Sequence, residues 1–121
     1  MLTLPESVRI YLATSPTDMR KGFDGLSALI EHEQGEDVYS GHLFVFVSRR
    51  GDRVKILTWE RGGFVLWYKR LERGQFKRPR ISARQKSVAL DAGQLAMLLE
   101  GVDYSKVRRG RRWRPPRHRA A

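Results

Sequence analysis

The sequence predicts a small α+β domain, and three observations support this fold class. Three apolar segments between residues 43 and 70 are separated by short glycine-containing turns, which is typical of antiparallel strands. Apolar residues between positions 19 and 30 recur at helical spacing. The 121 residues, 40% of them hydrophobic, supply material for one modest core. We therefore expect a single domain over residues 1–104, with a small antiparallel sheet of three to five strands, and a basic arm over residues 105–121.

The first expected strand covers residues 8–12, where β-branched and aromatic side chains alternate. A turn over residues 14–17 follows, and Thr17 or Asp18 is a candidate cap for the main N-terminal helix. The apolar residues of that helix lie four, three and four positions apart, which places them on one face. They are Met19, Phe23, Leu26 and Ile30. The helix is expected to end within the acidic stretch 31–37.

A three-stranded meander is expected next. Leu43–Val47 is uniformly apolar, as in a strand buried on both faces. Arg53–Trp59 and Phe64–Arg70 are the second and third strands, because the intervening turns are too short for anything but antiparallel neighbours. Residues 77–87 are strongly basic, hold one proline and no acid, and predict an exposed loop. A short C-terminal helix is expected over Asp91–Glu100, with leucines as its apolar stripe.

Charge is distributed very unevenly along the chain. Residues 1–48 hold three basic and seven acidic side chains, whereas residues 49–121 hold 21 basic and six acidic ones, and the net charge is +11. A basic excess of this size predicts a polyanionic partner and does not bear on the fold. A membrane surface is a weaker expectation than nucleic acid, because no basic amphipathic helix with a clean apolar face is present. No apolar run approaches the ~20 residues of a membrane helix, and the first residues lack the pattern of a signal peptide.

Several ordered motifs carry a resemblance to a known family. They are residues 17–26 (TDMRKGFDGL), 41–46 (GHLFVF), 50–53 (RGDR), 55–57 (KIL), 69–74 (KRLERG) and 98–103 (LLEGVD). In this order and spacing the chain resembles the accessory TnpB protein of insertion-sequence family sixty-six, the product of the element's second open reading frame. The resemblance covers roughly residues 4–104, and the chain departs from the usual pattern after Phe76, where Lys77-Arg78-Pro79 replaces a more apolar stretch.

The resemblance implies a bacterial mobile-element protein that assists transposition. In such elements a separate, larger transposase carries the acidic catalytic triad. No catalytic residue is established for the accessory family, so the resemblance transfers none. The implied partners are the DNA of the element ends and the transposase of the same element, in the cytoplasm and associated with the nucleoid.

The candidate nucleic-acid contacts are the cations that follow residue 48, since guanidinium groups bind phosphate oxygens in pairs. Three groups are expected to form the footprint: the meander, the loop that follows it and the C-terminal arm. They are Arg49, Arg50, Arg53, Lys55, Lys69, Arg70 and Arg73; Lys77, Arg78 and Arg80; and Arg108, Arg109, Arg111, Arg112 and Arg114. The competing interpretation is a solvated surface whose arginines pair with Asp52 and Glu60. We favour a binding surface because the cations greatly outnumber the nearby acids.

The aromatic residues Trp59, Trp67 and Tyr68 lie among these cations. On an exposed face they would stack on unpaired bases, at ~1–3 kcal/mol per base. A small domain needs the burial of such side chains, so core or cross-strand packing is the preferred interpretation.

Enzymatic chemistry is not expected. The chain contains no cysteine, which fits a reducing cytosol, and its three histidines show no metal-ligand spacing. The clustered acids Glu31, Glu33, Glu36 and Asp37 have no accompanying motif, and we interpret them as a solvated acidic loop able to contact a basic partner protein. We expect no catalytic residue, cofactor or metal. The function predicted is DNA binding in support of a transposase, and the alternatives are an RNA-binding module or a protein–protein adaptor that docks the transposase.

Overall fold

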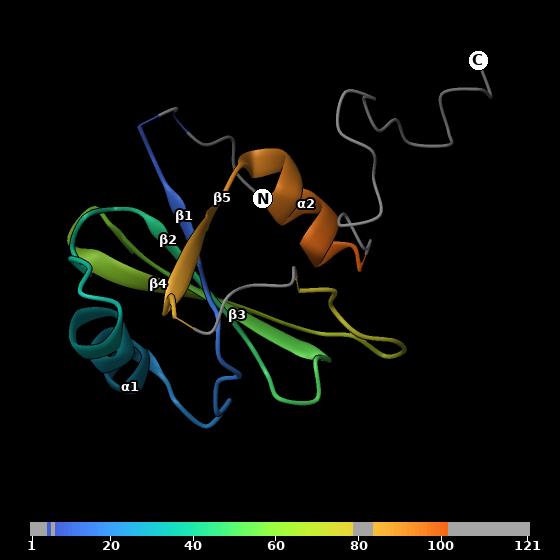
Figure 1. The fold of residues 1–121 in the computed structure, drawn as a ribbon. Coiled ribbons are helices and arrows are strands. Elements are labelled where there is room, and N and C mark those ends of the chain that lie inside the picture. The colour runs from blue at the N-terminus through green and yellow to red at the C-terminus, as the bar shows by residue number, and fades with distance from the viewer. Residues whose placement is uncertain (1–4, 6, 79–83, 102–121) are drawn as a thin grey trace, which may run out of the picture.

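The computed structural model describes Pro5, residues 7–78 and residues 84–101. A five-stranded sheet forms the middle layer, with helix α1 on one face and helix α2 on the other (Figure 1). The strands are β1 (Ile10–Ala13), β2 (Leu43–Val47), β3 (Arg53–Glu60), β4 (Gly63–Arg70) and β5 (Ser87–Leu90). Their order in the sheet is β4-β3-β2-β1-β5.

The helices are short. Helix α1 (Phe23–Ala28) runs directly into the π-helical turn η1 (Leu29–Glu33), and α2 covers Ala92–Leu99. The expected fold class, α+β with one main N-terminal helix and a short C-terminal helix, is therefore confirmed for the described residues. The expected basic arm over residues 105–121 lies outside them.

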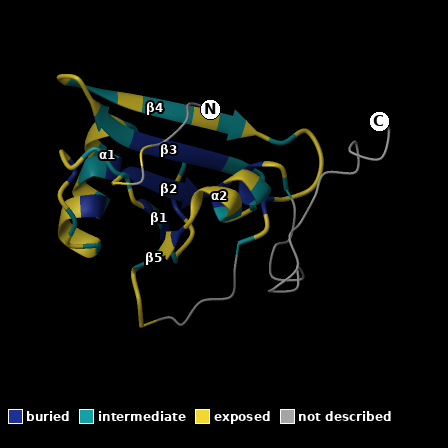
Figure 2. Ribbon diagram, turned by 90° about the horizontal axis from the view of Figure 1, so that it is seen from above, coloured by how far each residue is buried: buried dark blue, intermediate teal, exposed yellow. Residues whose placement is uncertain are grey.

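The sheet divides the core into two clusters because side chains alternate between the faces of each strand. On the α2 face, Leu12, Val45 and Ile56 pack with Leu95 and Leu98. The cluster on the other face joins α1 and η1 to strands β2 and β3 through Leu26, Ile30, Phe44, Phe46 and Leu57. Figure 2 shows the result: β2 and the middle of β3 are buried, while β4 and β5 at the edges retain exposed positions.

The expectation of a wholly antiparallel sheet is wrong, because β1 and β2 pair in parallel, with Tyr11 opposite Phe44. The connection between these strands contains α1 and η1, which cross one face and return the chain to the end of the sheet from which β1 started. The pairs β2–β3, β3–β4 and β1–β5 are antiparallel, so the sheet is mixed.

Strand β5 was not expected from the sequence, which predicts a basic loop up to residue 87. The strand pairs with β1, with Leu90 opposite Ile10 and Val88 opposite Leu12. Its four residues are too few to show a period-2 pattern, and the pairing depends on a β1 edge that only the folded sheet creates.

Helix α1 begins later than expected, at Phe23 with Gly22 as its N-cap. Thr17 instead bridges to Ser48 at the end of β2, and its N–H donates to the carbonyl of Val47 at 2.9 Å. Asp18 accepts from the N–H of Arg20 at 2.9 Å, which forms a local turn and caps no helix. Residues 17–22 therefore run along the end of the sheet before the helix starts.

Helix α2 has a reciprocal capping box. The Asp91 carboxylate accepts from the Gln94 N–H at 2.7 Å, and the Gln94 side chain accepts from the Asp91 N–H at 2.9 Å. We expect Asp91→Ala to lower the free energy of unfolding by about 1 kcal/mol, since it removes this cap. Urea unfolding measures the change, and Asp91→Asn, which keeps an acceptor, is the matched control. Equal stability of the two variants would show that the cap contributes nothing.

Candidate nucleic-acid interface

Five arginines lie at one end of the sheet and are called here the arginine surface: Arg49, Arg50, Arg53, Arg70 and Arg73. The carboxyl ends of β1, β2 and β4 meet the start of β3 at this end, as the registers Val47 opposite Val54 and Arg53 opposite Arg70 require. Four of the five side chains are exposed and Arg53 is half-buried. The fold thus brings together the cations predicted on the meander turn and those predicted after its third strand.

The cross-strand pair Arg53–Arg70 is the most unusual part of the arginine surface. Like charges directly opposite each other in a sheet destabilise it. Arg70 forms a long, exposed ion pair with Glu72, at 3.9 Å. An exposed ion pair of this length contributes little to stability. Two guanidinium groups in this register are suited to an external anion.

The turn that carries Arg49 and Arg50 is held firmly from several sides. Gly51 adopts φ +80°, and its N–H donates to the Ser48 carbonyl at 2.9 Å. The segment after β4 supports the turn, because Phe76 N–H donates to the Gly51 carbonyl at 2.7 Å and the Gln75 amide donates to the Arg50 carbonyl at 2.7 Å. The arginine side chains therefore extend from a fixed backbone.

The opposite end of the sheet is acidic. The segment that leads into β2 contains Glu31, Glu33, Glu36 and Asp37, and β3 ends at Glu60. Three aromatic rings also meet there: Tyr39 and Phe64 each lie 5.0 Å from the ring of Trp59, and the Tyr39 side chain is 57% exposed. The domain is thus polarised along its strands, with a basic end and an acidic end.

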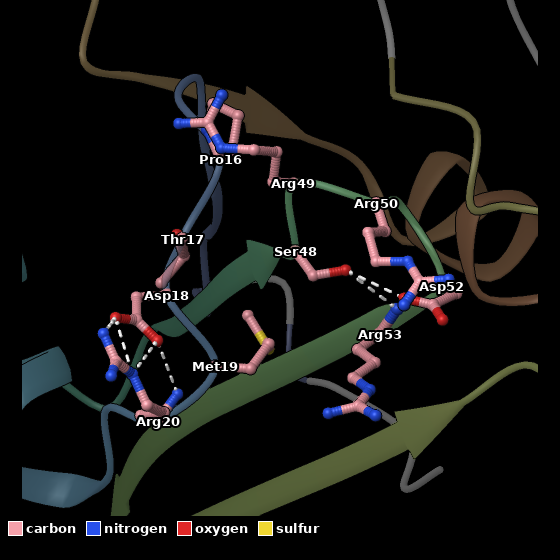
Figure 3. A pocket seen from close by; sticks show the side chains of 10 residues that line it. All are labelled: Pro16, Thr17, Asp18, Met19, Arg20, Ser48, Arg49, Arg50, Asp52 and Arg53. Atoms are coloured by element: carbon pink, nitrogen blue, oxygen red, sulfur yellow. Dashed lines mark hydrogen bonds and ion pairs between the residues drawn. The ribbon is translucent and has the colours of Figure 1, made fainter.

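A pocket of about 590 Å³ opens at the basic end, between residues 16–20 and residues 48–53 (Figure 3). The residues after β1 form one wall and the turn after β2 forms the other. Thr17 and Ser48 line the pocket although each is only 7% exposed, so they lie at its recessed part. Arg49 and Arg53 extend on opposite sides of them in Figure 3.

Arg20 also lines this pocket and was not predicted from the sequence, since it lies in the acidic half of the chain. It pairs with Asp18 at 2.7 Å, and the side chains of Arg20 and Asp18 are 91% and 43% exposed. The hydrogen bonds that Arg20 donates from its side chain and its backbone hold the pKa of Asp18 at about 2, below the ordinary 3.8. The same carboxylate raises the pKa of Arg20. Asp18 thus stays ionised and paired throughout the neutral range.

This pairing predicts a specific pH dependence. A lowered carboxyl pKa means that the pair is complete above pH 3.8 and is lost as the pH falls toward about 2. We expect the NMR titration of the Asp18 carboxyl to have its midpoint near pH 2 in the wild type and closer to 3.8 in Arg20→Gln. An unchanged midpoint in the variant would show that Arg20 is not the cause.

Lys55, one of the predicted phosphate contacts, has partners within the protein. Lys55 is 7% exposed, and its ammonium donates to the carbonyls of Met19 and Lys21, at 2.8 Å each. It also lies 4.9 Å above the ring of Tyr68. Lys55 therefore fixes the segment that precedes α1. Lys55 lies two residues after Arg53 in the same strand, and this position does not indicate that it is buried. Its burial depends on where residues 19–21 pass over the sheet.

The remaining predicted cations lie in different surroundings. Lys69 is half-buried, and its ammonium donates to the Leu99 carbonyl at 2.9 Å, so it holds the end of α2 and is not part of the arginine surface. Lys77 is exposed, whereas Arg78 is half-buried and reaches the Thr14 carbonyl at 3.5 Å. The predicted contacts that lie outside the described residues are Arg80, Arg108, Arg109, Arg111, Arg112 and Arg114.

The aromatic side chains follow the packing interpretation in part. Trp67 packs against the core cluster on the α2 face, and Trp59 belongs to the aromatic group at the acidic end. Tyr68 is 49% exposed and lies on the same face of β4 as Arg70, two residues away. Tyr68 is thus the described aromatic residue best placed beside the arginine surface.

Within residues 5, 7–78 and 84–101 there is no group of three or more His, Asp or Glu side chains that could hold a metal ion. His42 accepts a hydrogen bond from the Arg9 N–H at 3.0 Å, which is a structural role. None of the described helices has the length and apolar character needed to cross a membrane.

Comparison with known proteins gives consistent results. A family model described as IS66 Orf2 like protein matches residues 8–109. The chain is 36% identical over 115 residues to "Uncharacterized protein y4hO" of Sinorhizobium fredii (strain NBRC 101917 / NGR234), covering 95% of this chain and 96% of the relative. It is 33% identical over 109 residues to "Uncharacterized protein y4jC" of the same organism, covering 90% and 92%. No solved structure matches the chain.

Proposed function

Since this chain belongs to the family of IS66 Orf2-like proteins, we propose that it is a non-catalytic accessory protein of insertion-sequence transposition that binds DNA through the arginine surface. The transposase of the same element carries out the cutting and joining of strands. The accessory protein holds DNA at the element ends, or connects those ends to the transposase. It acts in the cytoplasm on nucleoid DNA.

The observation that carries the proposal is the placement of Arg53 opposite Arg70, beside a fixed turn with two more exposed arginines. Such an arrangement opposes folding stability unless an anion is bound between the charges. Forked guanidinium donors match phosphate oxygens. A row of phosphates in a nucleic-acid backbone satisfies several of these groups together.

The contacts proposed are to phosphate, so they set affinity and position and do not by themselves read sequence. Tyr68, which is 49% exposed, adds a stacking contact where a base is unpaired near the surface. Recognition of one element end in preference to other DNA then requires a further contribution, which the transposase can provide.

Footprinting on the element ends, with and without the transposase, tests this function. Protection without preference for the ends when the protein acts alone, and protection concentrated at the ends when the transposase is added, is the expected result. A matched competition between duplex DNA and structured RNA at equal salt separates DNA binding from the RNA-binding alternative. Stronger retention on the RNA would overturn the proposal.

The acidic end favours a second candidate function, that of an adaptor. Glu31, Glu33, Glu36 and Asp37 lie in the segment that leads into β2, which also contains Tyr39 with its exposed ring. Exposed aromatic and acidic side chains together suit a basic protein surface. Co-purification with the transposase after nuclease treatment, combined with loss of DNA retention, would support the adaptor and exclude direct DNA binding.

A further inference from the structure

We propose that the pocket between residues 16–20 and residues 48–53 binds a phosphate monoester, which on DNA is the 5′-phosphate at the end of a strand. This inference rests on the proposed function for the identity of the polymer. It goes further because it assigns a recessed site for one doubly charged group beside the arginine surface, with which the pocket shares Arg49, Arg50 and Arg53.

The position of the pocket supports a binding role. It lies at the carboxyl ends of β1 and β2, the two parallel neighbours of the sheet, and is built from the segments that leave those strands. Ligands of open α/β sheets bind outside the carboxyl ends of their parallel strands. Here the segments leaving β1 and β2 are still joined at the Thr17–Ser48 bridge, which lies within the lining of the pocket. A volume of about 590 Å³ is in the range of pockets that hold nucleotide-sized ligands.

The side chains around the pocket suit phosphate. Thr17 brings a hydroxyl group to the lining, and Arg49 and Arg53 lie on either side of it. The Ser48 hydroxyl is used within the turn, since it donates to Asp52 and accepts from the Arg53 N–H at 3.1 Å. The two carboxylates that also line the pocket are both engaged by neighbours. Asp18 is paired with Arg20, and Asp52 accepts from the Ser48 hydroxyl at 3.3 Å. The Ser48 hydroxyl is neutral and leaves the charge of Asp52 in place, so the positive excess at the pocket is that of Arg49, Arg50 and Arg53 less the charge of Asp52.

The depth of the site favours a chain end over an internal phosphate. Thr17 and Ser48 are each 7% exposed, so a ligand group must protrude to reach them. The internal phosphodiesters of a duplex lie along a broad convex surface and carry one negative charge each. A terminal monoester protrudes on a single bond and carries close to two charges at pH 7, since its second ionisation lies near pH 6.

Titration with inorganic phosphate, followed by NMR in a phosphate-free buffer of low salt, tests the pocket directly. We expect saturable shifts of the backbone amides of residues 17 and 48–53. Arg49→Gln should weaken this binding about tenfold, since a charge-assisted hydrogen bond is lost. Thr17→Val, which keeps the shape of the side chain and removes its hydroxyl, should weaken it severalfold. Arg61→Gln removes an exposed arginine at the turn after β3 and should bind as the wild type does. Absence of saturable shifts, or equal weakening in Arg61→Gln, would overturn the inference.

A second arm identifies the source of the phosphate. Two otherwise identical duplexes, one with 5′-phosphate and one with 5′-hydroxyl ends, are compared for binding to the full chain and to Thr17→Val. We expect the wild type to prefer the 5′-phosphate duplex several-fold and the variant to lose that preference while still binding both. Equal affinity of the wild type for the two duplexes overturns the inference and leaves the proposed function standing. Failure to bind either duplex removes both proposals.

Discussion

Replacing Arg49 and Arg53 together with glutamine is expected to weaken binding to duplex DNA roughly fiftyfold at 0.1 M salt. Each phosphate contact releases close to one counterion, and at this salt concentration each release contributes nearly a factor of ten to the binding constant. The two side chains lie on a fixed turn and at the start of β3, so movement of the backbone does not compensate for their loss. Fluorescence anisotropy with a labelled duplex measures the change.

The matched control is Arg9→Gln combined with Arg61→Gln. Both residues are exposed and lie at the other end of the sheet, before β1 and after β3, and the double variant loses the same two charges. It should bind DNA within about threefold of the wild type, since only the general field of the protein changes. Equal weakening in the two double variants would mean that net charge alone governs binding and that the arginine surface has no special role.

Lys55→Met is expected to lower the free energy of unfolding by about 3 kcal/mol. The substitution keeps the length of the side chain and removes a buried ammonium group that donates to the carbonyls of Met19 and Lys21, at 2.8 Å each. Hydrogen bonds to a charged group contribute about 1.5–3 kcal/mol, and the two carbonyls lose their donor when it is removed. Urea unfolding followed by circular dichroism measures the loss.

Lys86→Met is the matched control, since Lys86 is exposed and such substitutions usually change stability by less than about 0.5 kcal/mol. In Lys55→Met we also expect the NMR signals of residues 19–21 to broaden or shift, because Lys55 fixes this segment beside the pocket. If Lys55→Met unfolds with the same free energy as the wild type, the two hydrogen bonds do not hold the segment in solution.

The parts of the fold that could be predicted from the sequence are those set by local pattern. Leu43–Val47 is apolar throughout and is buried as β2, and the glycine turns on either side of β3 fix its pairing with both neighbours. The parallel pairing of β1 with β2 could not be predicted, because it depends on how α1 and η1 cross the sheet. Strand β5 is four residues long and is defined mainly by the edge of β1.

The candidate site was predictable to a similar degree. The charge asymmetry indicated Arg49, Arg50 and Arg53, and the structure places them on one turn and the adjoining strand start. The pocket could not be predicted, since one of its walls, including Thr17 and Arg20, comes from the acidic half of the chain. The partners of Lys55 could not be predicted for the same reason. Met19 and Lys21, whose carbonyls accept its hydrogen bonds, lie 36 and 34 positions earlier in the chain.

The measurement that tests DNA binding by the arginine surface most directly is the salt dependence of the binding constant. For the wild type, the logarithm of the binding constant should fall linearly with the logarithm of salt concentration, and the slope should flatten by about 0.9 for each phosphate contact removed in Arg49→Gln/Arg53→Gln. The Arg9→Gln/Arg61→Gln control should keep the wild-type slope. A lower affinity of the first variant with an unchanged slope would contradict direct contact between these arginines and phosphate.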